Sequence, residues 1–340
     1  MWQLACAILG FLCFPGPADA QHSAARMLPA SFEANRVYVH PVTAVGDTLN
    51  LITDSGGGLF LYSDVAERLG LSVRDTTVRG RSLSMGEPPE IVEPDGFPAF
   101  PGPPIVFRRS HPLVRMLETP DEDGLLGASW YGGHIWTLDY LNGEMVLHPS
   151  SDGLALDSTH TVPIGFPKGD DGELRTSYAS IEATIAGESH PFLLDTGATL
   201  LLSDRGQRAL GGPRHRGGSF VVASVFERWR ERHPEWRVIE GGSVYSGGKP
   251  IIRVPEVTIA GHTVGPVWFA RRPDRNFSKK GMARYMDRPV DGALGGSLFQ
   301  YFELTLDYPD ARAHFRRPNL IEAERQGEAH LDTRLPDPHD

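Results

Sequence analysis

The sequence predicts an all-β protein, mainly β with short helices, whose two halves form similar lobes. Glycine and proline supply 38 and 28 of the 340 residues, and the apolar runs between them are short, which favours many strands over long amphipathic helices. The second half of the chain also repeats the motifs of the first half in the same order. A chain of this length can bury two cores of ordinary domain size.

The repeat is visible as two pairs of matching segments. Residues 123–140 and 291–308 align without a gap and share Asp-Gly, Leu-Gly, Ser and a closing Thr-Leu-Asp-Tyr. Upstream of each copy, residues 51–64 contain LITDSGGGLFLYSD and residues 192–204 contain FLLDTGATLLLSD. Two matches in the same order indicate an internal duplication of the whole architecture.

In each half we expect two strands joined by a turn, then the Asp-Ser/Thr-Gly motif, a short helix and further strands. The last of these strands ends in two apolar residues followed by glycine, and we call it the apolar-apolar-Gly strand. Alternating segments on either side of Gly46-Asp47 and Gly187-Glu188 predict a hairpin in each half. The predicted hairpin strands are 36–45 with 48–53, and 178–186 with 190–194.

These elements divide the chain into segments. We expect a first lobe over 33–150, a polar linker over 151–174 that has room for a strand, and a second lobe over 175–317. The polar and charged segment 318–340 is expected to be a loosely ordered tail. An alternative assignment makes residues 21–32 a short propeptide, although they are too few to fill a long cleft.

Residues 1–20 predict a secretory signal peptide. A short apolar stretch is followed by Pro-Gly-Pro and then by Ala-Asp-Ala ending at Ala20, where cleavage is expected, so the protein would be exported to a periplasm or secreted. The alternative is a short membrane anchor, but the apolar run is shorter than the roughly 20 residues needed to span a bilayer. We therefore expect no stable membrane insertion after cleavage. The two cysteines, Cys6 and Cys13, lie within the signal, so the mature chain would contain no disulfide and no cysteine nucleophile.

The formal net charge of −10 argues against nucleic acid as a partner, because it would repel a phosphate backbone and no basic stripe with interleaved aromatics offsets it. One basic segment, 271–288, stands out. We interpret it as a solvated loop; the alternative is a substrate-selecting lip or a processing site.

Two aspartates carry the chemistry. Asp54 and Asp195 each end an apolar strand, where a carboxylate is costly to bury unless it is hydrogen-bonded or shares a proton. If the lobes pack about a pseudo-two-fold axis, the two loops meet, and two carboxylates a few ångströms apart cannot both ionise. Such a pair can position a water as nucleophile, protonate a carbonyl oxygen and then protonate a leaving amine.

The neighbouring residues suit that arrangement. Gly56 and Gly197 would permit the tight turns that present the carboxylates. The hydroxyls of Ser55 and Thr196 could bond to backbone across the lobe interface and hold the loops in register.

Two further strands are expected beside the catalytic loops. They contain Leu126 and Gly127 in the first half and Leu294 and Gly295 in the second, and their glycines would allow close backbone approach.

With these motifs in both halves, the chain resembles the pepsin and retropepsin clan of aspartic peptidases, and particularly bacterial retropepsin-like aspartyl proteases. The resemblance covers most of residues 33–317. It implies two similar pepsin/retropepsin-like β-barrel lobes around an interlobe cleft, with Asp54 and Asp195 as catalytic residues. It also implies an aspartic endopeptidase that acts on peptides or proteins without a cofactor or metal. Because one chain supplies both aspartates, we expect a monomer.

The chain departs from the family pattern in places. The first motif continues with Gly57-Gly58 and has one extra residue before its Ser-Asp. No tyrosine flap is recognisable in the first half, where 79–104 is expected to be irregular. Tyr245, within the glycine-rich segment 241–248, is a candidate for a flap hairpin; the alternative is an exposed glycine-rich turn.

Gly57 and Ala198 stand where a hydroxyl could otherwise hydrogen-bond the outer carboxylate and favour its charged form. We therefore predict that the pair titrates higher than in gastric-type enzymes, with an optimum at mildly acidic or neutral pH.

Other features have simpler explanations. His215 and His233 are expected at the surface rather than as ligands of a metal ion. Ser129 and Ser297 do not lie in the Gly-x-Ser-x-Gly motif of serine hydrolases, so a serine nucleophile has little support. A glycosidase also uses two carboxylates, but its chemistry does not need the duplicated Asp-Ser/Thr-Gly loops. Asp139 and Asp307 are expected to be structural turn formers. The main alternative function is a catalytically inactive pepsin-like fold that binds a peptide or protein in its cleft.

Overall fold

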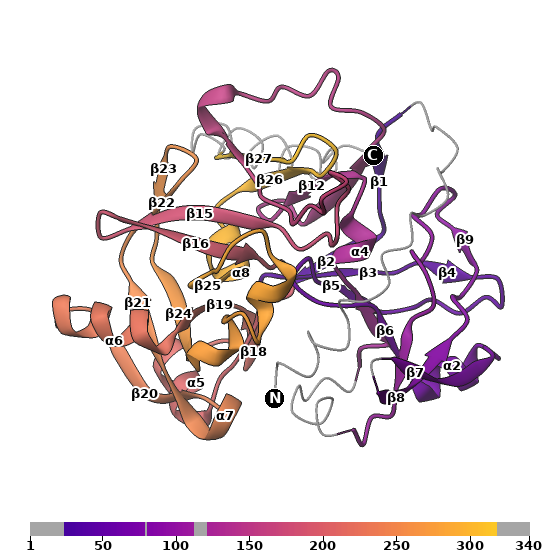
Figure 1. Cartoon of the computed structure of the whole chain (residues 1–340), viewed down its shortest axis with the longest axis horizontal. Coiled ribbons are helices and arrows are strands. Elements are labelled where there is room, and N and C mark those ends of the chain that lie inside the picture. Colours follow the sequence, from indigo (N-terminus) through magenta and orange to yellow (C-terminus); the bar gives the residue numbers. More distant parts are fainter. Residues whose placement is uncertain (1–23, 79, 112–120, 318–340) are drawn as a thin grey trace, which may run out of the picture.

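The computed structural model describes residues 24–317 except 79 and 112–120. The predicted signal peptide and the predicted tail lie outside the described residues. The chain is mostly β with short helices and forms two lobes that share a third sheet (Figure 1). None of the helices in this described part is long and apolar enough to cross a membrane.

The first lobe is built on an eight-stranded sheet in the order β2-β3-β5-β11-β6-β10-β8-β7. Its strands are β2 (Ala30–Glu33), β3 (Arg36–Val39), β5 (Leu51–Thr53), β6 (Phe60–Tyr62), β7 (Val73–Val78), β8 (Arg81–Gly86), β10 (Ile105–Phe107) and β11 (Gly124–Leu126).

The second lobe is built on a nine-stranded sheet in the order β20-β21-β24-β19-β25-β16-β15-β22-β23. Its strands are β15 (Ser180–Ile185), β16 (Glu188–Leu194), β19 (Ser219–Val222), β20 (Val238–Ser243), β21 (Lys249–Val254), β22 (Val257–Ile259), β23 (His262–Val264), β24 (Val267–Arg272) and β25 (Gly292–Leu294).

The two sheets have the same topology. The order β3-β5-β11-β6-β10-β8-β7 in the first lobe matches β15-β16-β25-β19-β24-β21-β20 in the second. In each lobe the strand that ends at the aspartate runs parallel to the apolar-apolar-Gly strand, β5 with β11 and β16 with β25. The two similar all-β lobes predicted from the duplication are therefore confirmed.

The third sheet joins the halves. It has six strands in the order β1-β13-β12-β26-β27-β14 and lies at the top of Figure 1, between the lobes. Its strands are β1 (Arg26–Met27), β12 (Ile135–Asp139), β13 (Glu144–His148), β14 (Thr161–Pro163), β26 (Glu303–Asp307) and β27 (Arg312–Arg316). The two copies of Thr-Leu-Asp-Tyr begin within β12 and β26, which pair antiparallel with Thr137 opposite Thr305. The halves are thus connected through their own repeated motif.

Short elements complete the fold. Two small sheets pair β4 (Val42–Thr43) with β9 (Ile91–Glu93), and β17 (Thr199–Leu201) with β18 (His215–Gly217). The helices are α2 (Ser63–Arg68), α4 (Ala128–Tyr131), α5 (Asp204–Leu210), α6 (Ala223–Arg232), α7 (Tyr245–Gly248) and α8 (Gly296–Phe299), with 3-10 turns η1 (Ser158–His160), η2 (Asp274–Asn276) and η3 (Met282–Tyr285).

The core runs continuously through both lobes and the third sheet. Large, fully buried side chains come from every part of it and include Trp130, Trp136, Phe192, Phe226, Phe269, Phe302 and Phe315. The long helix α6 buries Val225, Phe226 and Trp229, spaced for one helical face, and the Trp229 ring packs edge-on against Phe269 of β24. This helix therefore covers one face of the nine-stranded sheet.

Several expected elements differ in detail. The predicted first hairpin is present and continues in one register from the pairing of β3 with β5 to a bridge between Val42 and Thr48, and β4 pairs in addition with β9. The short helix predicted directly after each aspartate loop is preceded by a strand, β6 before α2 and β17 before α5. The linker does contain a strand, β14, and the described strands begin at Arg26.

The sequence match between 59–64 and 200–204 is not a structural match. By sheet order β6 corresponds to β19, because both lie between the apolar-apolar-Gly strand and a parallel partner. The second lobe therefore inserts β17, α5 and β18 after its aspartate loop.

Asp139 and Asp307 are turn formers, as expected. Asp139 Oδ1 accepts hydrogen bonds from the amides of Leu141 and Asn142, both at 3.0 Å, and Asp307 accepts one from the Asp310 amide at 2.9 Å.

Candidate active site

Asp54 and Asp195 occupy equivalent positions at the ends of β5 and β16. The Asp54 amide donates to the carbonyl of Leu126 at 2.9 Å, and the Asp195 amide donates to the carbonyl of Leu294, also at 2.9 Å. Each aspartate is thus fixed by the apolar-apolar-Gly strand of its own lobe, which is the role we expected for these strands.

The glycines of those strands lie against the aspartate loops. A Cβ added at Gly127 would lie 2.1 Å from the Gly58 carbonyl oxygen, and one added at Gly295 would lie 2.5 Å from the Gly218 carbonyl oxygen. Since real Cβ atoms do not approach backbone so closely, only glycine fits at either position without movement.

Four hydrogen bonds tie the two loops together across the lobe interface. The Ser55 amide donates to Thr196 Oγ1 and the Thr196 amide donates to Ser55 Oγ, each at 3.0 Å. The Ser55 hydroxyl then donates to the Leu194 carbonyl at 2.9 Å, and the Thr196 hydroxyl to the Thr53 carbonyl at 3.4 Å. All four groups are buried, so this reciprocal arrangement fixes the register of the two loops.

The two carboxyl groups face the opposite loops. A Cβ at Gly56 would lie 2.5 Å from Asp195 Cγ, and a Cβ at Gly197 would lie 2.3 Å from Asp54 Cγ. Each carboxyl therefore packs directly over the glycine of the other lobe, which explains why both motifs require glycine there.

The glycine at position 57 of the first motif has a steric explanation. A Cβ at Gly57 would lie 2.4 Å from Asp54 Oδ2, whereas its counterpart Ala198 in the second motif carries a methyl group. The Gly56 amide donates to Asp54 Oδ1 at 3.0 Å. The loop is glycine-rich because it wraps around its own carboxylate.

The two carboxyls differ electrostatically. Burial raises the pKa of Asp54, while a hydrogen bond from Asp195 and the amides of Gly56 and Gly57 oppose that rise. Burial first, and then the charge and hydrogen bond of Asp54, raise the pKa of Asp195 well above its ordinary value. Because two carboxyls this close cannot both ionise readily, we infer that the pair holds one proton between them. Asp195 is only 1% exposed, and Asp54 is partly buried.

Sequence reasoning missed Tyr131. This buried residue of α4 follows the first apolar-apolar-Gly strand, and its hydroxyl lies 3.2 Å from Thr196 Oγ1. The Trp136 indole N–H donates to the backbone carbonyl of Tyr131 at 3.0 Å and so fixes the end of α4. In the duplicated segment the matching residue is Phe299, so comparison of the two copies would have shown one hydroxyl without a counterpart.

Each lobe carries an antiparallel hairpin at the same edge of its sheet. In the first lobe β7 and β8 pair from Val73 opposite Gly86 to Val78 opposite Arg81, so the expectation of an irregular segment starting at residue 79 was wrong. It failed because this edge hairpin is polar and exposed. In the second lobe β20 and β21 form the hairpin, and Tyr245 begins the short helix α7 at its tip. Tyr245 is partly buried rather than in an exposed turn.

The other candidate residues have structural roles. The Ser297 hydroxyl lies 2.8 Å from the Ser219 hydroxyl in the core, and the His233 ring stacks on Trp236 with centroids 4.3 Å apart. His215 pairs in β18 opposite Leu201 and is partly buried. No group of three or more His, Cys, Asp or Glu side chains suited to a metal ion was found in the described part of the chain.

Comparison with known proteins adds one distant likeness. No protein-family model matches the chain, and no curated protein matches it. Among solved structures, the crystal structure of an aspartic proteinase from Irpex lacteus is similar over 88% of this chain and 99% of its own, with 12% sequence identity and a TM-score of 0.45. A likeness this distant carries no argument about activity, and the particular relation to bacterial retropepsin-like proteases stays a prediction.

Proposed function

We propose that the protein is an aspartic endopeptidase whose catalytic residues are Asp54 and Asp195. The observation that carries the proposal is the pair of carboxyls at equivalent strand ends, each packed over the glycine of the other lobe's motif. Ser55, Gly56, Thr196 and Gly197 support the pair through the cross-lobe hydrogen bonds and the close packing described above.

The pair suits peptide hydrolysis by an activated water. The Asp54 carboxylate, acting as general base, takes a proton from a water held between the carboxyls, and the resulting hydroxide equivalent attacks the peptide carbonyl carbon. Protonated Asp195 gives its proton to the carbonyl oxygen, forming a tetrahedral diol. Collapse of the diol breaks the C–N bond while the proton on Asp54 goes to the leaving amine. A proton from the diol then returns to Asp195, which restores the shared proton.

One polypeptide supplies both carboxyls, so we propose that a monomer is sufficient for activity. A reaction order above one in enzyme concentration would contradict this. Together with the predicted signal peptide, the proposal describes an exported enzyme that acts in a periplasm or outside the cell.

The test is cleavage of a mixed peptide library by residues 21–340 across about pH 3 to 8, followed by mass spectrometry. Activity is expected to vanish in Asp54→Asn and Asp195→Asn and with a statine-type inhibitor, and to persist in Asp152→Asn, which changes an exposed carboxylate. A folded wild-type protein that cleaves nothing but binds peptides would instead support the inactive binding fold.

A further inference from the structure

The segment that joins β24 to β25 is strongly basic. We define residues 271–288 as the basic lip; it holds seven basic and two acidic residues in a chain with a net charge of −10. The lip begins at the end of β24, where the Arg272 guanidinium lies over the rings of Phe220 and Tyr245. It leads into β25, the strand whose backbone binds the Asp195 amide. The lip is therefore directly connected to the strand that fixes one candidate catalytic residue.

The lip is anchored in the core of the second lobe. Its apolar residues Phe277, Met282, Tyr285 and Met286 are buried. The Thr176 hydroxyl also donates to the Tyr285 carbonyl at 2.7 Å. The lip is therefore held in place by the core rather than being a wholly solvated loop.

Tyr285 connects the lip to the candidate catalytic pair. Its ring packs against the Tyr178 ring, with centroids 6.0 Å apart. The Leu194 amide donates to the Ala179 carbonyl at 2.9 Å, which continues the pairing of β15 with β16. In that register Tyr178 lies opposite Asp195, and opposite residues of antiparallel strands place their side chains on the same face. The lip therefore lies on the Asp195 side of the pair.

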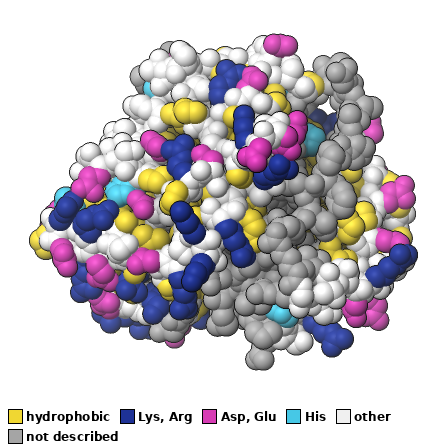
Figure 2. Space-filling view, in the orientation of Figure 1, with side chains coloured by type: hydrophobic (Ala, Val, Ile, Leu, Met, Phe, Trp, Pro, Cys, Tyr) yellow, Lys and Arg dark blue, Asp and Glu magenta, His cyan; other side chains and the backbone are white. Residues whose placement is uncertain are grey.

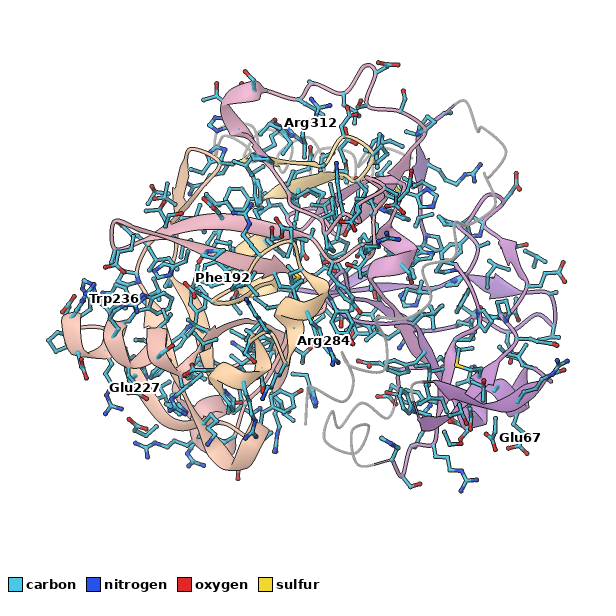
Figure 3. The ribbon with its side chains drawn as sticks, in the orientation of Figure 1. Glu67, Phe192, Glu227, Trp236, Arg284 and Arg312 are labelled. Carbon is cyan, nitrogen blue, oxygen red and sulfur yellow. The ribbon has the colours of Figure 1, made fainter. Side chains whose placement is uncertain are left out.

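Arg284, the neighbour of Tyr285, is exposed on the lip. Its guanidinium lies over the Tyr285 ring, 4.5 Å from the ring centroid. Because that ring is buried and anchored, the cation–π contact restricts the orientation of the guanidinium. The N–H donors of a guanidinium lie in its plane, so stacking leaves them able to bind an acceptor. Figure 3 shows Arg284 on the side of the second lobe that faces the first.

Three cations of the lip have no carboxylate partner among the described residues. Lys279, Lys280 and Arg284 are exposed and take part in no ion pair in this part of the chain. By contrast, the first and last arginines of the lip, Arg271 and Arg288, pair with glutamates. Figure 2 shows dark blue side chains gathered along the middle of this view, on the second-lobe side. The lip therefore presents positive charge that the protein itself does not neutralise.

We propose that Arg284 is a specificity-determining residue that binds an acidic side chain of the substrate, Asp or Glu, a few residues from the scissile bond on the Asp195 side. The proposal rests on the peptidase function proposed above. A guanidinium matches a carboxylate with two parallel hydrogen bonds. Lys279 and Lys280 add a positive field that attracts acidic segments to an otherwise acidic protein.

The experiment compares kcat/KM for matched peptides that differ only by Glu or Gln, placed at successive positions on each side of the cleaved bond. Wild type should prefer Glu at one position by about 3- to 10-fold, as expected for a partly exposed charged hydrogen bond. Arg284→Gln should remove that preference, mainly by slowing cleavage of the Glu peptide. Arg284→Glu should reverse it, because the new carboxylate repels the Glu peptide.

The matched control is Arg230→Gln. It removes the same charge from an exposed position on α6, and Figure 3 shows Glu227 of that helix on the outer side of the second lobe. This variant should keep both the activity and the preference for Glu. The preference of wild type should also weaken as NaCl is raised from about 0.02 to 0.5 M, since exposed charges are screened by salt.

The ratio of the two rates does not depend on the fraction of enzyme that is folded, so it separates specificity from stability. Wild type with no preference for Glu at any position would overturn the proposal. A preference that survives in Arg284→Gln, or that Arg230→Gln also removes, would overturn it as well. Arg284→Lys, which keeps the charge without the planar fork, should retain a weaker preference.

Binding separates this inference from the peptidase proposal. Calorimetry with Asp54→Asn should show tighter binding of the Glu peptide than of the Gln peptide, and adding Arg284→Gln should remove the difference. Selective binding without any cleavage by wild type would refute the peptidase and support the role of Arg284. Cleavage with equal binding and equal kcat/KM for both peptides would do the reverse.

Discussion

The hydroxyl oxygens of Thr137 and Thr305 lie 2.9 Å apart at the centre of the sheet shared by the two halves. They occupy the same position in the two copies of Thr-Leu-Asp-Tyr, and their strands pair antiparallel with these residues opposite each other. A local two-fold axis therefore passes between them. The reciprocal bonds of Ser55 and Thr196 are symmetric between the halves in the same way, so both the shared sheet and the candidate catalytic loops join equivalent residues of the two copies.

Removing a cross-lobe hydroxyl should destabilise the protein and reduce activity. Thr196→Ala leaves the buried Ser55 amide without its acceptor, which costs about 1–3 kcal/mol of unfolding free energy. Thr196→Ser keeps the hydroxyl and should be much milder. Thermal unfolding and kcat measure both effects, with Thr258→Ala, which removes an exposed hydroxyl pair, as control. Equal stability of the Ala and Ser variants would show that the bonds contribute nothing.

Adding a methyl group at Gly197 should abolish most activity. It would lie 2.3 Å from Asp54 Cγ, so the carboxyl or the loop must shift, and a displacement of about 1 Å can cost roughly 100-fold in kcat. Gly46→Ala is the control: its φ of 88° makes alanine strained, but no atom lies within 4 Å of the added methyl. That variant should lose stability and keep its kcat. Unchanged kcat in Gly197→Ala would contradict the geometry.

The pH profile should lie at mildly acidic to neutral pH. The active form needs Asp54 ionised and Asp195 protonated, and burial raises the pKa of both groups. The acidic limb of kcat/KM should therefore lie above the ordinary aspartate value of about 3.9. Ala198→Ser offers a hydroxyl near Asp195 and should move the profile to lower pH. A wild-type optimum below about 3.5 would refute the prediction.

The raised pKa values of the two aspartates also make the free energy of unfolding depend on pH. A carboxyl whose folded pKa is raised contributes stability that is present below its unfolded pKa and is lost as the pH rises through the folded pKa. Asp195→Asn cannot ionise, so at neutral pH it should unfold at a higher temperature than wild type while lacking activity. At about pH 3 the two proteins should have similar melting temperatures. A lower melting temperature for the variant at neutral pH would contradict the assignment.

Histidines should make the protein less stable in acid. His160 and His262 stack with ring centroids 3.8 Å apart, and His262 hydrogen-bonds the Phe315 carbonyl at 3.0 Å, fastening β23 to β27. Burial lowers the pKa of His262 and of His314, so stability falls as the pH drops through the unfolded histidine value of about 6.5. His262→Gln should weaken this dependence between about pH 7 and 5, as measured by denaturant unfolding. If the unfolding free energy of His262→Gln changed with pH as steeply as that of wild type, His262 would not be a cause of the acid sensitivity.

Much of the fold followed from local pattern. Alternation and turns located the strands around Asp54 and Asp195, and the duplicated motif predicted equivalent lobes. The pairing of β12 with β26 could not be predicted, because its central pair, Thr137 and Thr305, lies 168 positions apart in the sequence and a strand pattern does not specify its partner. The edge hairpin β7–β8 was missed because its polar side chains resemble a loop. Arg272 was noted only as part of a basic segment, since its burial depends on packing by Tyr245 from a distant hairpin.

The continuous chain through both lobes lets the two sides of the site become different. In an assembly of two identical subunits, every substitution would occur twice and the two aspartates would have identical surroundings. Here Tyr131 reaches Thr196, while its repeat partner Phe299 has no hydroxyl, and Gly57 faces Asp54 where the other loop has Ala198. A gene duplication joined in one reading frame thus allows an acid and a base to arise from two copies of one motif.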